Sequence, residues 1–216
     1  MLQKCKVTDF YKNSDILILW RNGRDMSYTT DCIKHNKRVF NLKAEKAFRE
    51  ANDMFYSRNY DRALELLQET VTLDPYHEKA FLLKGDIMLM NEGHEKQALD
   101  AYDMALRSNP KNSQALGSKA YVLDILGQFK SALECCDEAF SCINTKDNEQ
   151  VCSLYEQKLS LLCSLGEYDT AQNILAEAIE KLPEENSDYL KSCFLSKIRA
   201  NRAKNKENQP NLKLIF

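Results

Sequence analysis

The sequence predicts an all-α protein made of tandem pairs of antiparallel helices. A short motif recurs at nearly constant spacing, and prolines follow the motif at a fixed distance. In addition, 6 Gly and 4 Pro among 216 residues leave few turn-formers for a many-stranded sheet. Apolar residues make up 44% of the chain and charged residues 29%, as in ordinary soluble globular proteins. The fold prediction therefore depends on the repeat rather than on the composition.

The repeated motif consists of a polar residue, an aromatic residue, two variable positions and alanine. It occurs at 59–63, 128–132 and 167–171. One more copy, at 95–98 and second in chain order, lacks the aromatic residue. Its alanines are Ala63, Ala98, Ala132 and Ala171, with separations of 35, 34 and 39 residues. Twelve residues later stand Pro75, Pro110, Asn144 and Pro183, respectively. Such a period indicates a repeat architecture.

Each repeat is expected to contain two helices that approach closely at small residues. The alanine on the second helix faces a small or apolar residue on the first, and these residues are Ala51, Gly85, Ala120 and Leu159. Proline cannot continue a helix, so it ends each unit. The predicted helices are 44–57 and 60–73, 78–91 and 95–108, 113–126 and 129–142, and 150–165 and 168–181.

The second repeat is the best-preserved copy. It reads Phe81-x-x-Lys84-Gly85-x-x-Met88, then Ala98-x-x-x-Tyr102 and Pro110. This pattern resembles the tetratricopeptide-repeat family, and the resemblance covers about residues 44–185. It implies a right-handed superhelical solenoid of about four helix-turn-helix units, at 44–77, 78–112, 113–146 and 150–185. We further expect a basic N-terminal extension at 1–43 that is partly ordered at best, a capping helix at 186–204 and a disordered tail at 205–216.

The charges are divided unevenly along the chain. Residues 1–43 carry a formal charge of +5, residues 44–185 carry −12, and residues 186–216 carry +5. An acidic body repels a phosphate backbone, so nucleic acid is not the expected partner of the repeats. No stretch approaches the 20 or so apolar residues that a membrane span needs. A cytoplasmic location is the resulting expectation.

The pattern of reactive side chains predicts no catalytic site, metal or cofactor. None of the eight cysteines forms a CxxC pair, and the three histidines are scattered singly. Cys135 and Cys136 fall on the second helix of the third repeat, where a buried cysteine behaves as a small hydrophobe. A glycine-rich phosphate loop is also missing from the sequence. We therefore expect a binding protein rather than an enzyme.

The family resemblance implies that the first helix of every unit lines a concave groove that binds a protein or peptide. The predicted groove residues are Phe48, Asn52, Phe55, Tyr56, Leu82, Asp86, Leu89, Tyr121 and Asp124, with Ser160 and Ser164 in the fourth unit. Several of these residues could instead serve packing within or between units. Asn52 matches one position of the basic clamp by which some members bind chaperone tails. The other clamp positions hold Phe48, Leu83, Gln114 and Ser118, so the clamp is missing.

The sequence favours an adaptor or scaffold that binds a peptide or helix with apolar anchors and some positive charge. One alternative is a client-specific chaperone or regulatory subunit that shields an apolar segment. A second alternative is an RNA-associated protein that uses its basic termini. Residues 14–20 or 212–216 could also occupy the groove of the same or a neighbouring chain, which would produce self-association. A local helix at 14–24, packed on the first unit, is slightly favoured over that arrangement.

Overall fold

The computed structural model describes residues 11–13, 16–21, 24–27, 30–90, 93–143 and 147–204. The chain forms two compact units, Met1–His77 and Glu78–Phe216. The predicted disordered tail at 205–216, and with it the 212–216 segment considered for self-association, lies outside the described residues. Within the described part of the chain, no helix combines the length and apolar character that crossing a membrane requires.

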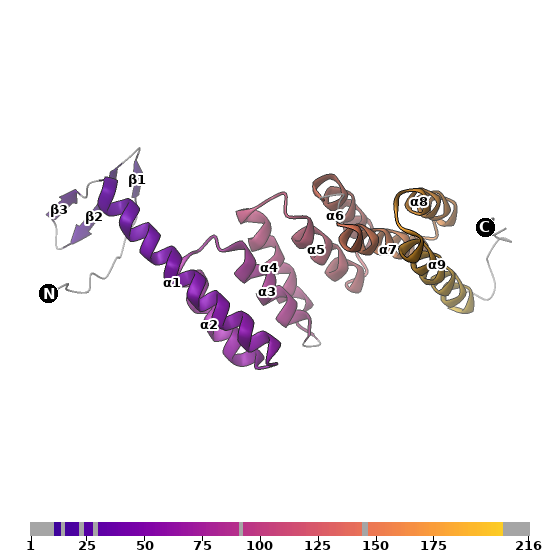
Figure 1. Ribbon diagram of the computed structural model, residues 1–216, viewed down its shortest axis with the longest axis horizontal. Helices are drawn as coiled ribbons and strands as arrows, with labels where there is room; N and C mark the ends of the chain where they lie inside the picture. Colours follow the sequence, from indigo (N-terminus) through magenta and orange to yellow (C-terminus); the bar gives the residue numbers. More distant parts are fainter. Residues whose placement is uncertain are drawn as a thin grey trace. The chain divides into compact units, whose positions relative to one another are not determined.

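The first unit contains a small antiparallel sheet followed by one helix pair. The sheet has the strands β1 (Tyr11–Asn13), β2 (Ile16–Arg21) and β3 (Arg24–Ser27) in the order β1-β2-β3. Tyr11 pairs with Ile18, and Leu19 pairs with Met26. The helices are α1 (Thr30–Tyr56) and α2 (Tyr60–Leu73), drawn in indigo to violet in Figure 1.

This N-terminal region differs from the sequence-based expectation. The local helix expected at 14–24 is wrong, because residues Ile16–Arg21 form the central strand of the sheet. The first helix also begins at Thr30, well before the expected residue 44. The continuous apolar run in Ile16–Arg21 is compatible with a strand or a helix, and periodicity alone cannot separate the two.

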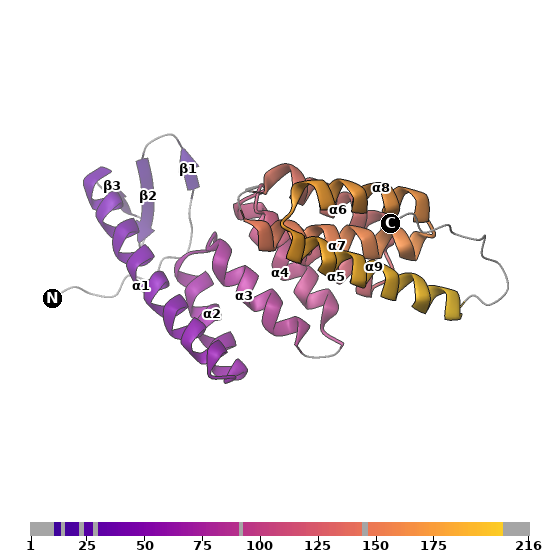
Figure 2. The same cartoon turned by 45° about the vertical axis from the view of Figure 1, so that its right-hand side comes forward.

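The second unit consists of consecutive helices. They are α3 (Glu78–Leu89), α4 (Glu95–Ser108), α5 (Ser113–Ile125), α6 (Phe129–Cys142), α7 (Asn148–Leu165), α8 (Tyr168–Lys181) and α9 (Glu184–Lys204). Helices α3 and α4, α5 and α6, and α7 and α8 form antiparallel pairs, and α9 lies beside α7 (Figure 2). From residue 60 onward, the helices begin and end within two residues of the predicted bounds. The predicted helical-repeat fold is therefore confirmed.

Local side-chain chemistry explains where these helices begin and end. The side chains of Asn112 and Asp147 accept hydrogen bonds from backbone N–H groups three residues later, at 2.8 and 3.1 Å, and so cap α5 and α7. Gly127 and Gly166 adopt positive φ angles of 72° and 80° in the turns that follow these helices. The side-chain caps at the helix starts and the glycine turns at the helix ends limit the length of each helix and let the next helix run antiparallel to it.

The core of the second unit lies between the paired helices and under the last helix. The motif alanines Ala98, Ala132 and Ala171 are fully buried. Leu190, Phe194 and Ile198 of α9 are buried against α7 and α8, in the same cluster as Leu175. Helix α9 thus covers the apolar face that the last pair would otherwise expose, as a solenoid cap must.

The contact between Gly85 and Tyr102 shows how closely the helices of one pair approach. Tyr102 of α4 is fully buried, and its ring lies directly against the backbone of α3 at Gly85. A Cβ atom at position 85 would lie 2.5 Å from Tyr102 Cε1, which is shorter than any normal contact. The pair can close to this distance only because position 85 carries no side chain.

We predict that Gly85→Ala destabilises the protein by about 1–3 kcal/mol, because the added methyl group overpacks a rigid ring. Gly117→Ala on α5 is the matched control. Its Cβ would lie 3.3 Å from the Cδ2 atom of Leu154, the end of a side chain that can move. This change should be neutral or stabilise the helix by up to about 1 kcal/mol. Urea unfolding measures the free energy of unfolding of both variants. Equal changes in the two would contradict overpacking of the Tyr102 ring as the cause.

Candidate partner-binding groove

A cavity of about 480 Å³ opens on the second unit, along the first helices of three consecutive pairs. Helices α3, α5 and α7 supply most of its lining. The lining residues are Asp86, Leu89, Tyr102, Ser113, Gln114, Gly117, Ser118, Tyr121, Ile143, Gln150, Ser153, Leu154 and Gln157. We call this cavity the α3–α5–α7 groove. Its volume suits a few side chains of a bound polypeptide.

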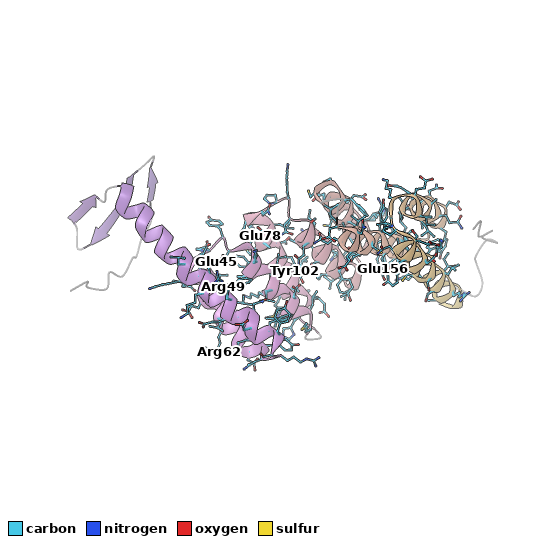
Figure 3. The ribbon with its side chains drawn as sticks, viewed as in Figure 1. Glu45, Arg49, Arg62, Glu78, Tyr102 and Glu156 are labelled. Carbon is cyan, nitrogen blue, oxygen red and sulfur yellow. The ribbon has the colours of Figure 1, made fainter. Side chains whose placement is uncertain are left out.

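One wall of the groove contains a partly buried carboxylate. The hydroxyl group of Tyr102, labelled in Figure 3, donates a hydrogen bond to Asp86 Oδ1 at 2.7 Å. Burial raises the pKa of the Asp86 carboxyl above its usual range, and the Tyr102 hydrogen bond offsets part of that rise. Burial also raises the pKa of Tyr102, and the negative charge of Asp86 adds to this rise. Tyr102 therefore stays a neutral donor that fixes the orientation of Asp86.

The lining of the groove is rich in amide and hydroxyl groups. Its amide side chains are Gln114, Gln150 and Gln157, and its hydroxyl side chains are Ser113, Ser118 and Ser153. Gln157 Nε2 donates to the carbonyl oxygen of Gly117 at 3.0 Å, which links α7 to α5. Amides donate and accept hydrogen bonds, so this surface can bind the N–H and C=O groups of another main chain.

Apolar side chains complete the lining. Tyr121 is half exposed, with an exposed fraction of 50%, while Leu154 is buried and forms part of the wall. Leu89 and Ile143 contribute further apolar surface. Among the residues that the structure describes, Asp86 is the only charged side chain in this lining. The described lining thus combines neutral polar side chains, apolar side chains and a single carboxylate.

The structure brings together three of the predicted site residues of the second unit, namely Asp86, Leu89 and Tyr121. Leu82 is buried, with an exposed fraction of 7%, and belongs to the core. Asp124 is partly exposed on α5, outside the residues that line the groove. Ser160 and Ser164, expected from the fourth repeat, are also outside this lining.

The other four predicted residues lie in the first unit. Phe48, Asn52 and Phe55 are partly buried, and Tyr56 is 76% exposed. The ring of Phe48 packs against His77 at 4.8 Å between centroids, and the ring of Phe55 lies 5.6 Å from Tyr56 and 5.9 Å from Tyr60. Phe48 and Phe55 therefore contribute to packing within the first unit, and their role in partner binding stays a prediction.

Sequence reasoning missed Tyr102 and chose the wrong residues of α7, since the groove is lined by Gln150, Ser153, Leu154 and Gln157 rather than by Ser160 and Ser164. Gln150, Ser153 and Gln157 follow one another at helical spacing, which places them on one face of α7. The same spacing was available in the sequence as a signal. The clamp positions Gln114 and Ser118, which lack the basic side chains of the clamp, do lie in the groove.

Cys135 and Cys136 are poorly placed to act as nucleophiles. Cys136 is fully buried, and its thiol donates to the carbonyl oxygen of Leu154 at 3.6 Å. Burial raises the pKa of Cys136 to about 12, and burial also raises the pKa of Cys135. Both therefore remain protonated at neutral pH, whereas a nucleophilic cysteine needs its thiolate form.

Comparison with known proteins agrees with this architecture. The tetratricopeptide-repeat profile matches residues 48–113. The photosystem I assembly protein Ycf3 of Synechococcus elongatus is 31% identical over 140 residues, which span 62% of this chain and 77% of that protein. Ycf3 of a second Synechococcus strain matches equally well. The chain belongs to the tetratricopeptide-repeat family.

Several solved structures share this fold, and YrrB and TTC0263 among them are described as tetratricopeptide-repeat proteins. YrrB, described as having an unusual peptide-binding site, has a TM-score of 0.58 and 23% identity, and the match covers 83% of this chain and 84% of YrrB. PilF of Pseudomonas aeruginosa has a TM-score of 0.62 and 14% identity, with 80% of each chain covered. TTC0263 of Thermus thermophilus has a TM-score of 0.55 and 19% identity, with 76% and 93% covered. As a member of the tetratricopeptide-repeat family, the chain is a scaffold for protein interaction.

The raised pKa of Asp86 predicts a pH-dependent stability. A carboxyl group whose pKa is higher in the folded state favours folding when it is protonated. This contribution to the free energy of unfolding is fully present below the pKa of the unfolded chain, about 3.9. It is lost as the pH rises through the pKa that Asp86 has in the folded protein. Wild type should therefore lose stability relative to Asp86→Asn over that interval. Urea unfolding at a series of pH values measures this difference, and a difference independent of pH would contradict the buried-carboxylate account.

Proposed function

We propose that this protein is a non-catalytic adaptor that binds an extended segment of a partner protein in the α3–α5–α7 groove. The observation that carries the proposal is the convergence of three first helices on one cavity lined by both polar and apolar side chains. Ligand sites in proteins commonly combine an apolar lining with a few placed polar groups. The cytoplasmic location expected from the sequence belongs to the same proposal.

The polar side chains of the lining favour an extended peptide over a helix. A helix satisfies its backbone N–H and C=O groups internally, so it would leave the amide groups of the groove without partners. The main chain of an extended segment has unsatisfied donors and acceptors along its whole length. Gln114, Gln150 and Gln157 offer both kinds of group along α5 and α7.

The charge of the groove limits the class of partner. Among the described residues, no Lys or Arg lines the cavity, and its one charged side chain is acidic. An acidic peptide or a free carboxylate would meet no cation there and would be repelled by Asp86. The proposal therefore concerns neutral or basic segments with apolar side chains, which could contact Leu89, Tyr121 and Leu154.

A second candidate is a dedicated assembly chaperone that shields an apolar segment of one client. It is supported by the similarity to Ycf3, whose name describes it as a photosystem I assembly protein. Several large apolar side chains of the second unit are also at least half exposed, among them Met90, Tyr121 and Ile125. A chaperone of this kind should bind its client over a larger area than the groove, whereas an adaptor should bind a short isolated peptide.

We predict that Gln114→Ala combined with Tyr121→Ala, which we call the groove variant, loses the partner on affinity isolation from the source cell. Both side chains reach solvent, so the variant should fold normally. The control is Lys130→Ala combined with Glu134→Ala, which changes two residues of α6 that do not line the groove. Circular dichroism checks the folding of both. Retention of the same partner by the groove variant would contradict the proposed site.

A further inference from the structure

Asp86 in the α3–α5–α7 groove differs from two other carboxylates of the second unit, which are paired with lysines. Asp103 pairs with Lys119 at 2.8 Å, and Asp137 pairs with Lys158 at 2.6 Å. Asp86, by contrast, has the neutral hydroxyl of Tyr102 as its hydrogen-bond partner. Within the described lining of the groove, no cationic side chain therefore neutralises this carboxylate.

We infer that Asp86 selects a single Lys or Arg side chain in the bound peptide, with uncharged residues on either side of it. This inference rests on the proposed function of the groove and specifies the partner: a neutral extended segment that carries one basic residue. Asp86 would contact the cation directly, and Tyr102 would act as a positioning residue that holds the carboxylate in the groove.

Desolvation provides the physical reason for this selection. A carboxylate that has lost part of its water is stabilised by an opposite charge more strongly than an exposed carboxylate would be. Burial already raises the pKa of Asp86, which indicates that its ionised form lacks full compensation. A peptide cation would supply that compensation. The same carboxylate disfavours a peptide with Asp or Glu at this point, so the contact discriminates in both directions.

Two other features favour a basic residue. Tyr121 lines the same groove, and the face of an aromatic ring attracts Lys and Arg side chains. Residues 44–185 also carry a formal charge of −12, which attracts a cationic segment over longer distances. The rest of the described lining is uncharged, so a second peptide charge would find no partner in it.

The test begins with selection of random 12-residue peptides displayed on phage against the full chain. Peptides enriched on wild type should share one Lys or Arg at a fixed position among uncharged residues. Replacing that residue by Met should weaken binding to wild type by about tenfold or more. The same replacement should have no effect on binding to Asp86→Asn, because the charge interaction is already absent.

The variants separate this contact from general effects of charge and folding. In Asp86→Asn, the new amide oxygen can still accept the Tyr102 hydrogen bond, so this variant should keep the fold. Asp124→Asn removes the same charge from α5 outside the groove and should leave the preference for Lys or Arg intact. If Asp124→Asn abolishes the preference, or if Asp86→Asn retains it, the inference is wrong.

The experiment also distinguishes failure of the inference from failure of the proposed function. If no peptide is enriched, or if enriched peptides bind the groove variant as well as wild type, the groove is not the binding site and both proposals fall. If the peptides require Gln114 and Tyr121 but contain no shared basic residue, the proposed function stands. In that case the role of Asp86 is overturned.

Discussion

The close approach of two helices within each repeat is the constraint on which the rest of this structure depends. Where α4 meets α3, the ring of Tyr102 occupies the space that a side chain at Gly85 would need. Ala98, Ala132 and Ala171 are fully buried on the second helices. Short separations of this kind are accessible only to small residues, so the periodic Ala and Gly positions determine where the helices pair.

That same packing shapes the α3–α5–α7 groove. Because Tyr102 is held against Gly85, its hydroxyl is directed at Asp86 on the next position of α3. A residue of the helix core therefore orients the one charged side chain in the described lining of the groove. Tyr102 therefore has two roles. Its ring packs the α3–α4 pair, and its hydroxyl group orients the carboxylate that a partner would meet. A groove with neutral amides and one carboxylate suits an adaptor for extended, weakly basic segments.

The sequence predicted the helices well because small residues and prolines mark their contacts and ends, as Ala98 and Pro110 do for α4. It failed at Ile16–Arg21, where a short apolar run has no period that separates strand from helix. For the groove, position in the repeat identified Asp86, Leu89 and Tyr121. It missed Gln150 and Gln157, because the position carried over from the other repeats falls at Ser160, nearer the end of α7, whereas the groove is lined by residues nearer its start. It also missed the function of Tyr102, since a packing position gives no indication of where a hydroxyl group points.

Site-specific photo-crosslinking in the cell would locate the surface that meets the partner. A benzoylphenylalanine placed at Tyr121 in the groove, and in a second protein at Lys130 on α6, would be irradiated in the source cell, and the crosslinked peptides would be mapped by mass spectrometry. The account predicts that position 121 crosslinks to one short segment of one partner and that position 130 does not. Crosslinks from position 130 to that partner, with none from position 121, would contradict a binding site in the α3–α5–α7 groove.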